Sequence, residues 1–292
     1  MENDIKDLQN AILDIFKEFK RICEKHNLNY FAIGGTCIGA IRHGGFIPWD
    51  DDLDVAMPID DYNKFRKIAK DELKSKYKLV DYIDNESYRF HFLKIENVNT
   101  TFVDKWESSD PDKYKGVYID IMPMVGISKN NFVSSFTRFK YYCYNKFNKY
   151  IRAPYSEEEN IKGKLFWILS KPLFCFKSKN YYSLKFEKLN VKQKITSKNN
   201  ILFVWRIPLI SPYENVFDYS MFNNYKDVKF EDTTIRVPID YDGYLKKDFG
   251  DYMKLPPEEK RKTHKPVILD LKKSYIEYAK EKRDEKNECN SK

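Results

Sequence analysis

IGGTCIGAIRHGGFIPWDDDLDVAM, from Ile33 to Met57, is the stretch that decides the fold of this 292-residue chain. It joins a glycine pair to an acidic cluster that ends in Asp52 and Asp54, two residues apart. Side chains two apart on a β-strand point to the same side of the sheet, so both carboxylates lie together if Leu53 and Val55 face a core. Adjacent carboxylates repel each other, and the pattern therefore predicts a cation between them.

The overall composition indicates a folded protein with an acidic partner. Hydrophobic residues make up 42% and aromatic residues 16% of the chain, which is enough for a core and excludes disorder as its main state. The formal net charge of +8 favours a phosphate-bearing substrate, an anionic membrane surface or nucleic acid. Charge alone does not choose among these partners.

The five cysteines and the chain's first residues bear on the compartment. The cysteine number is odd and no Cys-x-x-Cys pair occurs, so neither a disulfide framework nor a zinc cluster is indicated. MENDIKDLQN is acidic and polar where a secretory signal would be basic and then apolar. We expect a cytoplasmic protein, with peripheral contact at the inner face of the membrane as an open alternative.

Periodic patterns predict a mixed α/β (α+β) fold with a sheet flanked by helices. Helical spacing of apolar residues predicts helices over 5–27 and 60–73, and Thr36 is expected to cap a short helix that ends at Arg42. We predict strands over 30–33, around Asp52 and Asp54, and over 78–82, 88–96, 100–105 and 117–122, the last of which carries Asp120.

The chain also divides by composition. We predict a core over 1–127, a helical insertion rich in Lys, Phe and Tyr over 128–200, a C-terminal part of the same core over 201–270, and a charged tail over 271–292.

The glycine turn and three aspartates form one candidate site. A glycine-rich turn at a helix N-terminus offers backbone N–H groups to a phosphate, here from Gly34, Gly35 and Thr36. Asp52, Asp54 and Asp120 could hold one or two Mg²⁺ ions, with Mn²⁺ as an alternative. Such parts suit phosphoryl-type transfer from a nucleoside diphosphate ester. The alternative is a solvated acidic turn, which the apolar flanks of these aspartates disfavour.

A longer stretch carries a family resemblance. AIGGTCIGAIRHGGFIPWDDDLDVAMPIDD, from Ala32 to Asp61, resembles the LicD family of phosphotransferases, which includes the fukutin-related proteins. The resemblance continues around Lys94 and Asn99–Thr101, in YIDIMPM around Asp120, and in DYDGYLKKDFGDYMKLPPEEKRKTH near the C-terminus. It skips most of residues 128–200.

The resemblance implies a nucleotidyltransferase-like fold and a reaction. The expected enzyme moves phosphocholine, or a similar phospho-alcohol, from CDP-choline or a related CDP-alcohol to a hydroxyl of a glycan or lipid-linked glycan, with no nucleic acid as partner. The resemblance assigns Asp52, Asp54 and Asp120 to the metal, and Gly34, Gly35 and Thr36 to the phosphates. Asp120 is the expected general base, unless metal binding alone activates the hydroxyl. Arg42 and Lys94 are expected to contact the donor.

Alternatives stay open at this point. One is a nucleotidyltransferase that uses a nucleoside triphosphate, and another is a non-enzymatic basic protein that binds membranes or RNA. The basic aromatic stretch 137–150 and the apolar stretch 165–176 fit either an interfacial membrane surface or an insertion that covers the cleft.

Overall fold

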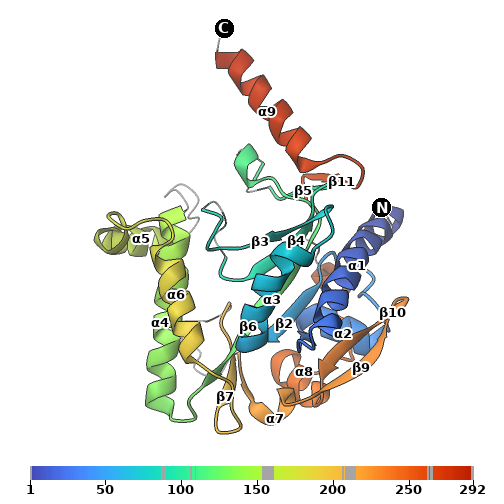
Figure 1. Cartoon of the computed structure of the whole chain (residues 1–292), viewed down its shortest axis with the longest axis vertical. Coiled ribbons are helices and arrows are strands. Elements are labelled where there is room, and N and C mark those ends of the chain that lie inside the picture. Colours follow the sequence, from blue (N-terminus) through green and yellow to red (C-terminus); the bar gives the residue numbers. More distant parts are fainter. Residues whose placement is uncertain are drawn as a thin grey trace.

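The computed structural model describes residues 2–86, 88, 90–105, 107–108, 110–152, 161–205, 207, 215–261, 263 and 266–290. Helices flank a mixed β-sheet in this part of the chain (Figure 1), which confirms the predicted fold class.

The main sheet has the path β1-β2-β6-β4-β3, and β7 continues from β6 to β8. Its strands are β1 (Phe31–Ala32), β2 (Asp54–Pro58), β3 (Tyr77–Val80), β4 (Leu93–Asn97), β6 (Tyr118–Ile127), β7 (Asn200–Phe203) and β8 (Val216–Asp218). The β2–β6 pair is parallel, and the other pairs are antiparallel. The ten-residue strand β6 is therefore the axis of the sheet, since it joins β2, β4 and β7.

Three helices from the first part of the chain accompany this sheet. They are α1 (Glu2–Lys25), α2 (Gly34–Arg42) and α3 (Ile59–Glu72). Both α1 and α3 contact β6, and aromatic rings fill the space between them, with Phe19 5.0 Å from Phe65 and 5.1 Å from Tyr30 between ring centroids. The predicted helices over 5–27 and 60–73 are thus present, and their apolar stripes are buried as expected.

Smaller elements complete the core. The hairpin of β9 (Tyr225–Phe230) and β10 (Thr233–Pro238) packs near β1 and α2, and β5 (Thr101–Val103) pairs with β11 (Ile268–Asp270). Short helices α7 (Tyr219–Phe222) and α8 (Tyr241–Phe249) follow β8 and β10, and η1 (Pro111–Lys113) and η3 (Glu258–Lys260) are single 3₁₀ turns. Helix α9 (Tyr275–Asn290) projects from the top of the view in Figure 1.

Residues between the two halves of the sheet are helical, as predicted for 128–200. Helices α4 (Asn131–Arg152), α5 (Ile161–Phe174) and α6 (Tyr181–Lys192) form a block at one side of the molecule, with α5 outermost (Figure 1). The boundaries proposed for the domains remain predictions.

Several strand boundaries differ from the sequence prediction. The strand expected over 88–96 begins only at Leu93. Continued pairing in the same register would bring Phe90 opposite Met124, where β7 already occupies that edge of β6. The strand expected over 117–122 continues to Ile127 for the same reason. Asp52 lies just before β2, which begins at Asp54, so the two carboxylates do not both belong to the strand.

Candidate active site

Two of the predicted carboxylates meet where β2 and β6 begin to pair. Asp54 and Asp120 are register partners in the parallel β2–β6 ladder, and the N–H of Asp120 donates to the carbonyl of Leu53 at 3.0 Å. Register partners on neighbouring strands carry their side chains on the same face of the sheet. Asp52, two residues before Asp54, acts electrostatically on the Asp54 carboxyl together with Asp120, so the three acidic groups share one region.

The glycine turn faces these carboxylates. Ile33 donates its N–H to the carbonyl of Asp54 at 3.2 Å, and Gly34 follows with a φ of +56°, in the left-handed region that favours glycine. A Cβ at Gly34 would lie 3.8 Å from Asp54 Oδ2, and one at Gly35 would lie 2.8 Å from Asp50 Oδ2. The start of α2 therefore lies against the acidic cluster, and the positive φ of Gly34 is the feature that favours glycine in this turn.

Thr36 has a different local role from the predicted one. Helix α2 begins at Gly34 with Ile33 as its N-cap, and no side chain caps it, so the expected Thr36 cap is wrong. The buried Thr36 hydroxyl instead accepts the N–H of Asp54 at 2.8 Å. This contact ties the first turn of α2 to the strand that carries Asp54. The backbone N–H groups of Gly35 and Thr36 belong to the same turn, where no carbonyl of the helix can accept a hydrogen bond from them.

Tyr244 of α8 is a part of the site that sequence reasoning missed. Its hydroxyl accepts the N–H of Gly34 at 2.9 Å, although the two residues lie 210 positions apart. The ring is 1% exposed and packs between Phe217 and Phe222. The segment around Tyr244 belongs to the late stretch that carried the family resemblance, and this was the one signal in the sequence for its involvement.

Lys94 is the cation of the cluster. It is the register partner of Asp120 across β4 and β6, its Nζ donates to Asp120 Oδ1 at 2.5 Å, and it lies 3.4 Å from the centroid of the Tyr118 ring. Its side chain is only 8% exposed, although a lysine on a strand usually faces solvent. Burial lowers the pKa of the Lys94 ammonium, and the Asp120 carboxylate opposes that change.

The negative charge around Asp54 exceeds what Lys94 balances. Burial, followed by the charges of Asp52 and Asp120, raises the pKa of the Asp54 carboxyl well above its usual range. Crowded carboxylates with oxygen donors only are what a hard divalent cation such as Mg²⁺ binds. Among the described residues, no group of three or more His, Cys, Asp or Glu side chains is already arranged around a metal position. The cluster fits a cation in charge and donor type, and Lys94 holds one of its oxygens.

Arg42 lies at the other end of α2. Its guanidinium donates to the carbonyls of Tyr252 at 2.6 Å and Lys254 at 3.4 Å, and to His43 Nε2 at 3.0 Å. These contacts fasten α2 to the loop after α8. The predicted role of Arg42 in donor binding remains a prediction beside this structural one.

A cavity of about 370 Å³ opens next to Asp120. Aromatic rings and charged groups alternate on its wall. Phe90 and Phe92 stack with ring centroids 5.3 Å apart, Tyr88 packs edge-on against both, and Lys94 and Tyr118 lie at the end near Asp120. Tyr88, Phe90 and Phe92 thus line a cavity instead of extending β4.

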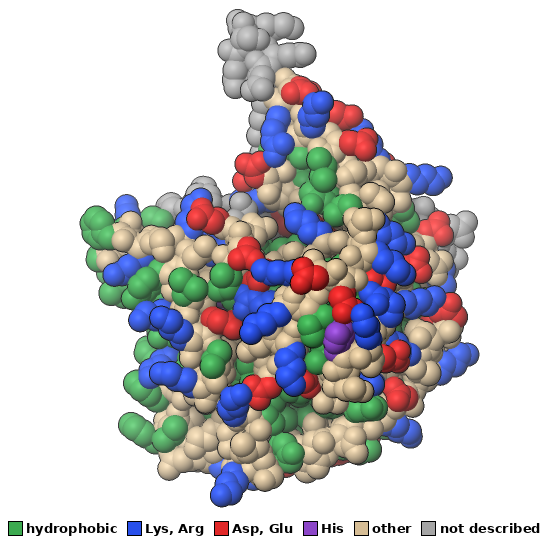
Figure 2. All heavy atoms as spheres, in the orientation of Figure 1, with side chains coloured by type: hydrophobic (Ala, Val, Ile, Leu, Met, Phe, Trp, Pro, Cys, Tyr) green, Lys and Arg blue, Asp and Glu red, His purple; other side chains and the backbone are tan. Residues whose placement is uncertain are grey.

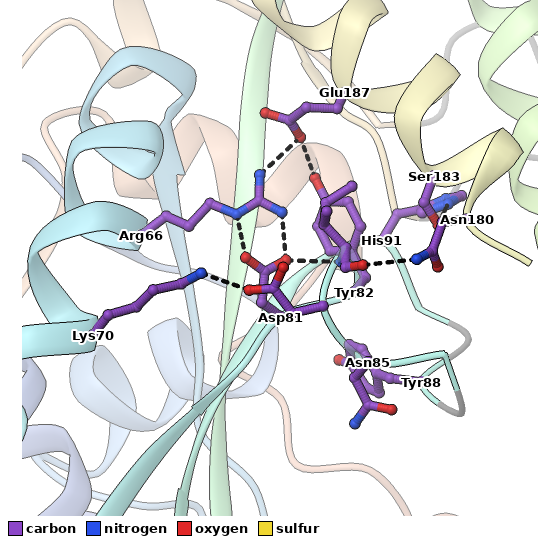
Figure 3. Close-up of polar contacts among 12 residues, drawn as sticks. Arg66, Lys70, Asp81, Tyr82, Asn85, Tyr88, His91, Asn180, Ser183 and Glu187 are labelled. Carbon is purple, nitrogen blue, oxygen red and sulfur yellow. Dashed lines mark hydrogen bonds and ion pairs between the residues drawn. The ribbon is translucent and has the colours of Figure 1, made fainter.

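The polar network in Figure 3 holds one wall of this cavity. Arg66 of α3 pairs with Asp81 through two hydrogen bonds and with Glu187 of α6 at 3.2 Å, and Tyr82 donates to Glu187. The buried His91 contacts Asn145 Oδ1 at 2.6 Å and stacks on a phenylalanine ring of α6. Since burial lowers the pKa of His91 to about 3, this imidazole is neutral near pH 7.

Arg152, the last residue of α4, completes the wall. It donates to the carbonyls of Tyr82, Asn85 and Tyr88, and also to the side chains of Asn180 and Ser183. Asn85 and Tyr88 line the cavity, and Figure 3 shows both on the loop that faces the α6 residues. Arg152 therefore joins the helical block to the cavity wall, together with the Glu187 and Asn145 contacts above.

Comparison with known proteins gives the class to which this fold and site belong. Residues 27–159 match the LicD/FKTN/FKRP nucleotidyltransferase domain, so this stretch is a member of that domain family. The chain is 29% identical over 270 residues to the lipopolysaccharide cholinephosphotransferase LicD of Haemophilus influenzae, covering 89% of this chain and 95% of the relative. The chain is therefore similar to this cholinephosphotransferase over nearly the whole length of both proteins.

Shorter matches involve two uncharacterised rickettsial proteins. One from Rickettsia typhi is 36% identical over 58 residues, 20% of this chain and 19% of the relative. One from Rickettsia prowazekii is 26% identical over 112 residues, 38% of each.

Proposed function

We propose that this protein transfers a phosphorylated alcohol, phosphocholine in the first place, from a CDP-linked donor to a hydroxyl of a cell-surface glycan. The observation that carries the proposal is the pairing of Asp54 and Asp120 at the start of β2 and β6, directly opposite the glycine turn of α2. The relative from Haemophilus influenzae, a lipopolysaccharide cholinephosphotransferase, supports choline as the alcohol and a glycan as the acceptor.

Asp52, Asp54 and Asp120 are the residues that would hold Mg²⁺, in one or two ions. The raised pKa of Asp54 and the oxygen donors of all three support this assignment. When bound, the ion offsets negative charge on the phosphates and on the leaving group. The ion pair with Lys94 uses Oδ1 of Asp120, and we assign Oδ2 to the metal or to the proton of the acceptor hydroxyl.

The remaining steps fall to the chain itself. The amides of Gly35 and Thr36 bind phosphate oxygens at the start of α2, where the helix dipole favours negative charge. The acceptor oxygen attacks the phosphorus nearer the alcohol, the bond between that phosphorus and the bridging oxygen breaks, and CMP leaves with the bridging oxygen. The hydroxyl proton passes to Asp120.

The cavity beside Asp120 is the site that we assign to the alcohol end of the donor. Lysines on the cavity wall pair with its carboxylates, Lys115 with Asp104 and Glu107, and Lys78 with Glu96. The support for a cationic alcohol therefore comes from the rings of Tyr88, Phe90 and Phe92, because aromatic ring faces attract a trimethylammonium group. These groups favour choline over an uncharged alcohol such as ribitol.

Two measurements test the proposal. With CDP-choline, Mg²⁺ and a glycan acceptor, the account predicts release of CMP; release of pyrophosphate from a nucleoside triphosphate would instead support the nucleotidyltransferase alternative. Titration calorimetry should show tighter binding of CDP-choline than of CDP-ribitol, and binding of neither would contradict the assignment.

A variant at the cavity tests whether this cavity binds the choline group. Phe90 is 40% exposed, so Phe90→Ala is expected to leave the fold intact. The change should weaken CDP-choline binding about fivefold to tenfold through loss of a cation–π face, and leave CDP-ribitol binding unchanged. Equal weakening of both donors would place the choline elsewhere. Phe249→Ala, at a similarly exposed phenylalanine of α8, is the matched control.

A further inference from the structure

Helices α4 and α5 carry an unusual concentration of exposed apolar side chains. Eleven of the 21 large hydrophobic residues that are exposed in the described part of the chain lie between positions 132 and 176. The most exposed are Phe176 at 89%, Ile161 at 84%, Phe132 at 83% and Leu169 at 71%. Isolated apolar residues on a surface are ordinary, but a contiguous set marks an interaction site.

Helix α5 is the clearest part of this surface. Its exposed residues Leu165, Ile168, Leu169 and Leu173 follow the spacing of one face of the helix. An apolar helix face normally packs against a protein core or lies in contact with lipid, and in α5 this face is exposed. In Figure 2 green apolar side chains, with blue lysines among them, form the left edge of the molecule, where Figure 1 places α4 and α5.

The same segment holds the positive charge of the protein. Residues 128–200 contain 16 Lys and Arg against four Glu and no Asp, which leaves 36 basic and 40 acidic residues in the rest of the chain. The chain is therefore basic through this segment alone. Exposed lysines flank the apolar residues directly, with Lys171 beside Trp167 and Lys177 beside Tyr181.

We propose that this α4–α5 surface, from Phe132 to Phe176 with its flanking lysines, docks the protein on an anionic lipid bilayer. Apolar side chains would enter the interfacial region while the lysines meet anionic headgroups. The charge argues against a second copy of the chain as the occupant, because two such basic surfaces repel each other. No helix in the described residues is long and apolar enough to cross a bilayer.

The docking surface has a direct connection to the cavity. Arg152 ends α4 and donates to the carbonyls of Asn85 and Tyr88 on the cavity wall. A bilayer held against α4 and α5 would thus lie on the same helical block that positions that wall. Docking itself rests on the surface alone, and does not depend on the proposed reaction.

Flotation of the full-length protein with vesicles tests the proposal. We expect binding to phosphatidylcholine vesicles that contain about one-third phosphatidylglycerol, much weaker binding to phosphatidylcholine alone, and loss of binding as salt rises. The double variant Leu169→Asp and Phe176→Asp should bind at least about tenfold more weakly. Ile276→Asp, on α9 and 58% exposed, is the matched control and should bind as the wild type does.

A charge variant separates the two contributions. Lys171→Glu with Lys177→Glu should also weaken binding at least about tenfold, since both lysines would otherwise be attracted to the anionic headgroups. Absence of binding to the anionic vesicles, or binding that the Leu169 and Phe176 variant retains, would overturn the proposal. Sedimentation without lipid measures the oligomeric state. If the wild type is a dimer and the Leu169 and Phe176 double variant is a monomer, the surface binds a second copy of the chain instead of a bilayer.

Discussion

Replacement of Lys94 by methionine tests whether this lysine balances the acidic cluster. Lys94 pairs with Asp120 at 2.5 Å, and the two side chains are 8% and 14% exposed. Removal of one partner from a buried ion pair costs about 3–5 kcal/mol, because the other charge remains buried without compensation. For a chain of this size, that loss lowers the melting temperature by about 10 °C. Urea unfolding and thermal melting without divalent cations measure both quantities.

Lys78→Met is the matched control for this change. Lys78 lines the same cavity and lies 3.6 Å from Glu96 Oε1, but its side chain is 56% exposed, and the buried Glu96 keeps a second partner because the Tyr275 hydroxyl donates to it at 2.9 Å. The loss of Lys78 should therefore cost less than the loss of Lys94. Added Mg²⁺ should raise the melting temperature of Lys94→Met more than that of the wild type, because Asp120 then has both oxygens available. If Lys94→Met were as stable as the Lys78 control, the charge balance described for the site would be refuted.

Three further predictions concern the supports of the site. His91 has a pKa of about 3 in the folded protein against an ordinary 6.5, so as the pH falls the unfolded state takes up a proton on this residue before the folded state does. The free energy of unfolding should therefore fall by about 2 kcal/mol from pH 7 to near pH 5. Urea unfolding of His91→Gln should show a fall that is smaller by the same amount. Tyr244→Phe leaves the Gly34 N–H without its acceptor and should lower the unfolding free energy by about 1–3 kcal/mol; an unchanged urea midpoint would contradict the contact. Arg152→Lys has three N–H donors on one nitrogen, whereas the guanidinium serves three carbonyls and the side chains of Asn148, Asn180 and Ser183, so steady-state kinetics should show a raised KM for the donor and a nearly unchanged kcat. Loss of kcat alone would count against a positioning role.

The sequence predicted the elements near the glycine turn well, because each depends on local signals. Periodic apolar residues predicted α1 and α3, and the glycines around Gly34 and Gly44 marked the ends of α2, both with positive φ. The predicted strand boundaries were wrong where the length of a strand depends on which neighbouring strand it pairs with. Residues 88–92 have the composition of a strand, but β7 occupies the edge of β6 that they would need.

For the candidate site, the sequence indicated which acidic residues to consider but not which residues surround them. The two-residue spacing of Asp52 and Asp54 indicated a shared face, and the register of β2 with β6 brings Asp120 to Asp54. Nothing local to Lys94 indicated that it would be buried against Asp120 and Tyr118, since burial depends on which strands flank β6. The Tyr244 contact with Gly34 spans 210 residues and could be found only once the chain was folded.

The most direct test of the proposed function measures CMP release by the wild type and by Asp54→Asn. Both proteins are given CDP-choline, Mg²⁺ and a glycan acceptor, and thermal melting establishes that the variant is folded. The account predicts that the wild type releases CMP and that Asp54→Asn loses this activity at least about a hundredfold, because metal ligation supplies several kcal/mol of charge stabilisation. A folded Asp54→Asn protein that releases CMP at the wild-type rate would contradict the assignment of this aspartate and of the site around it.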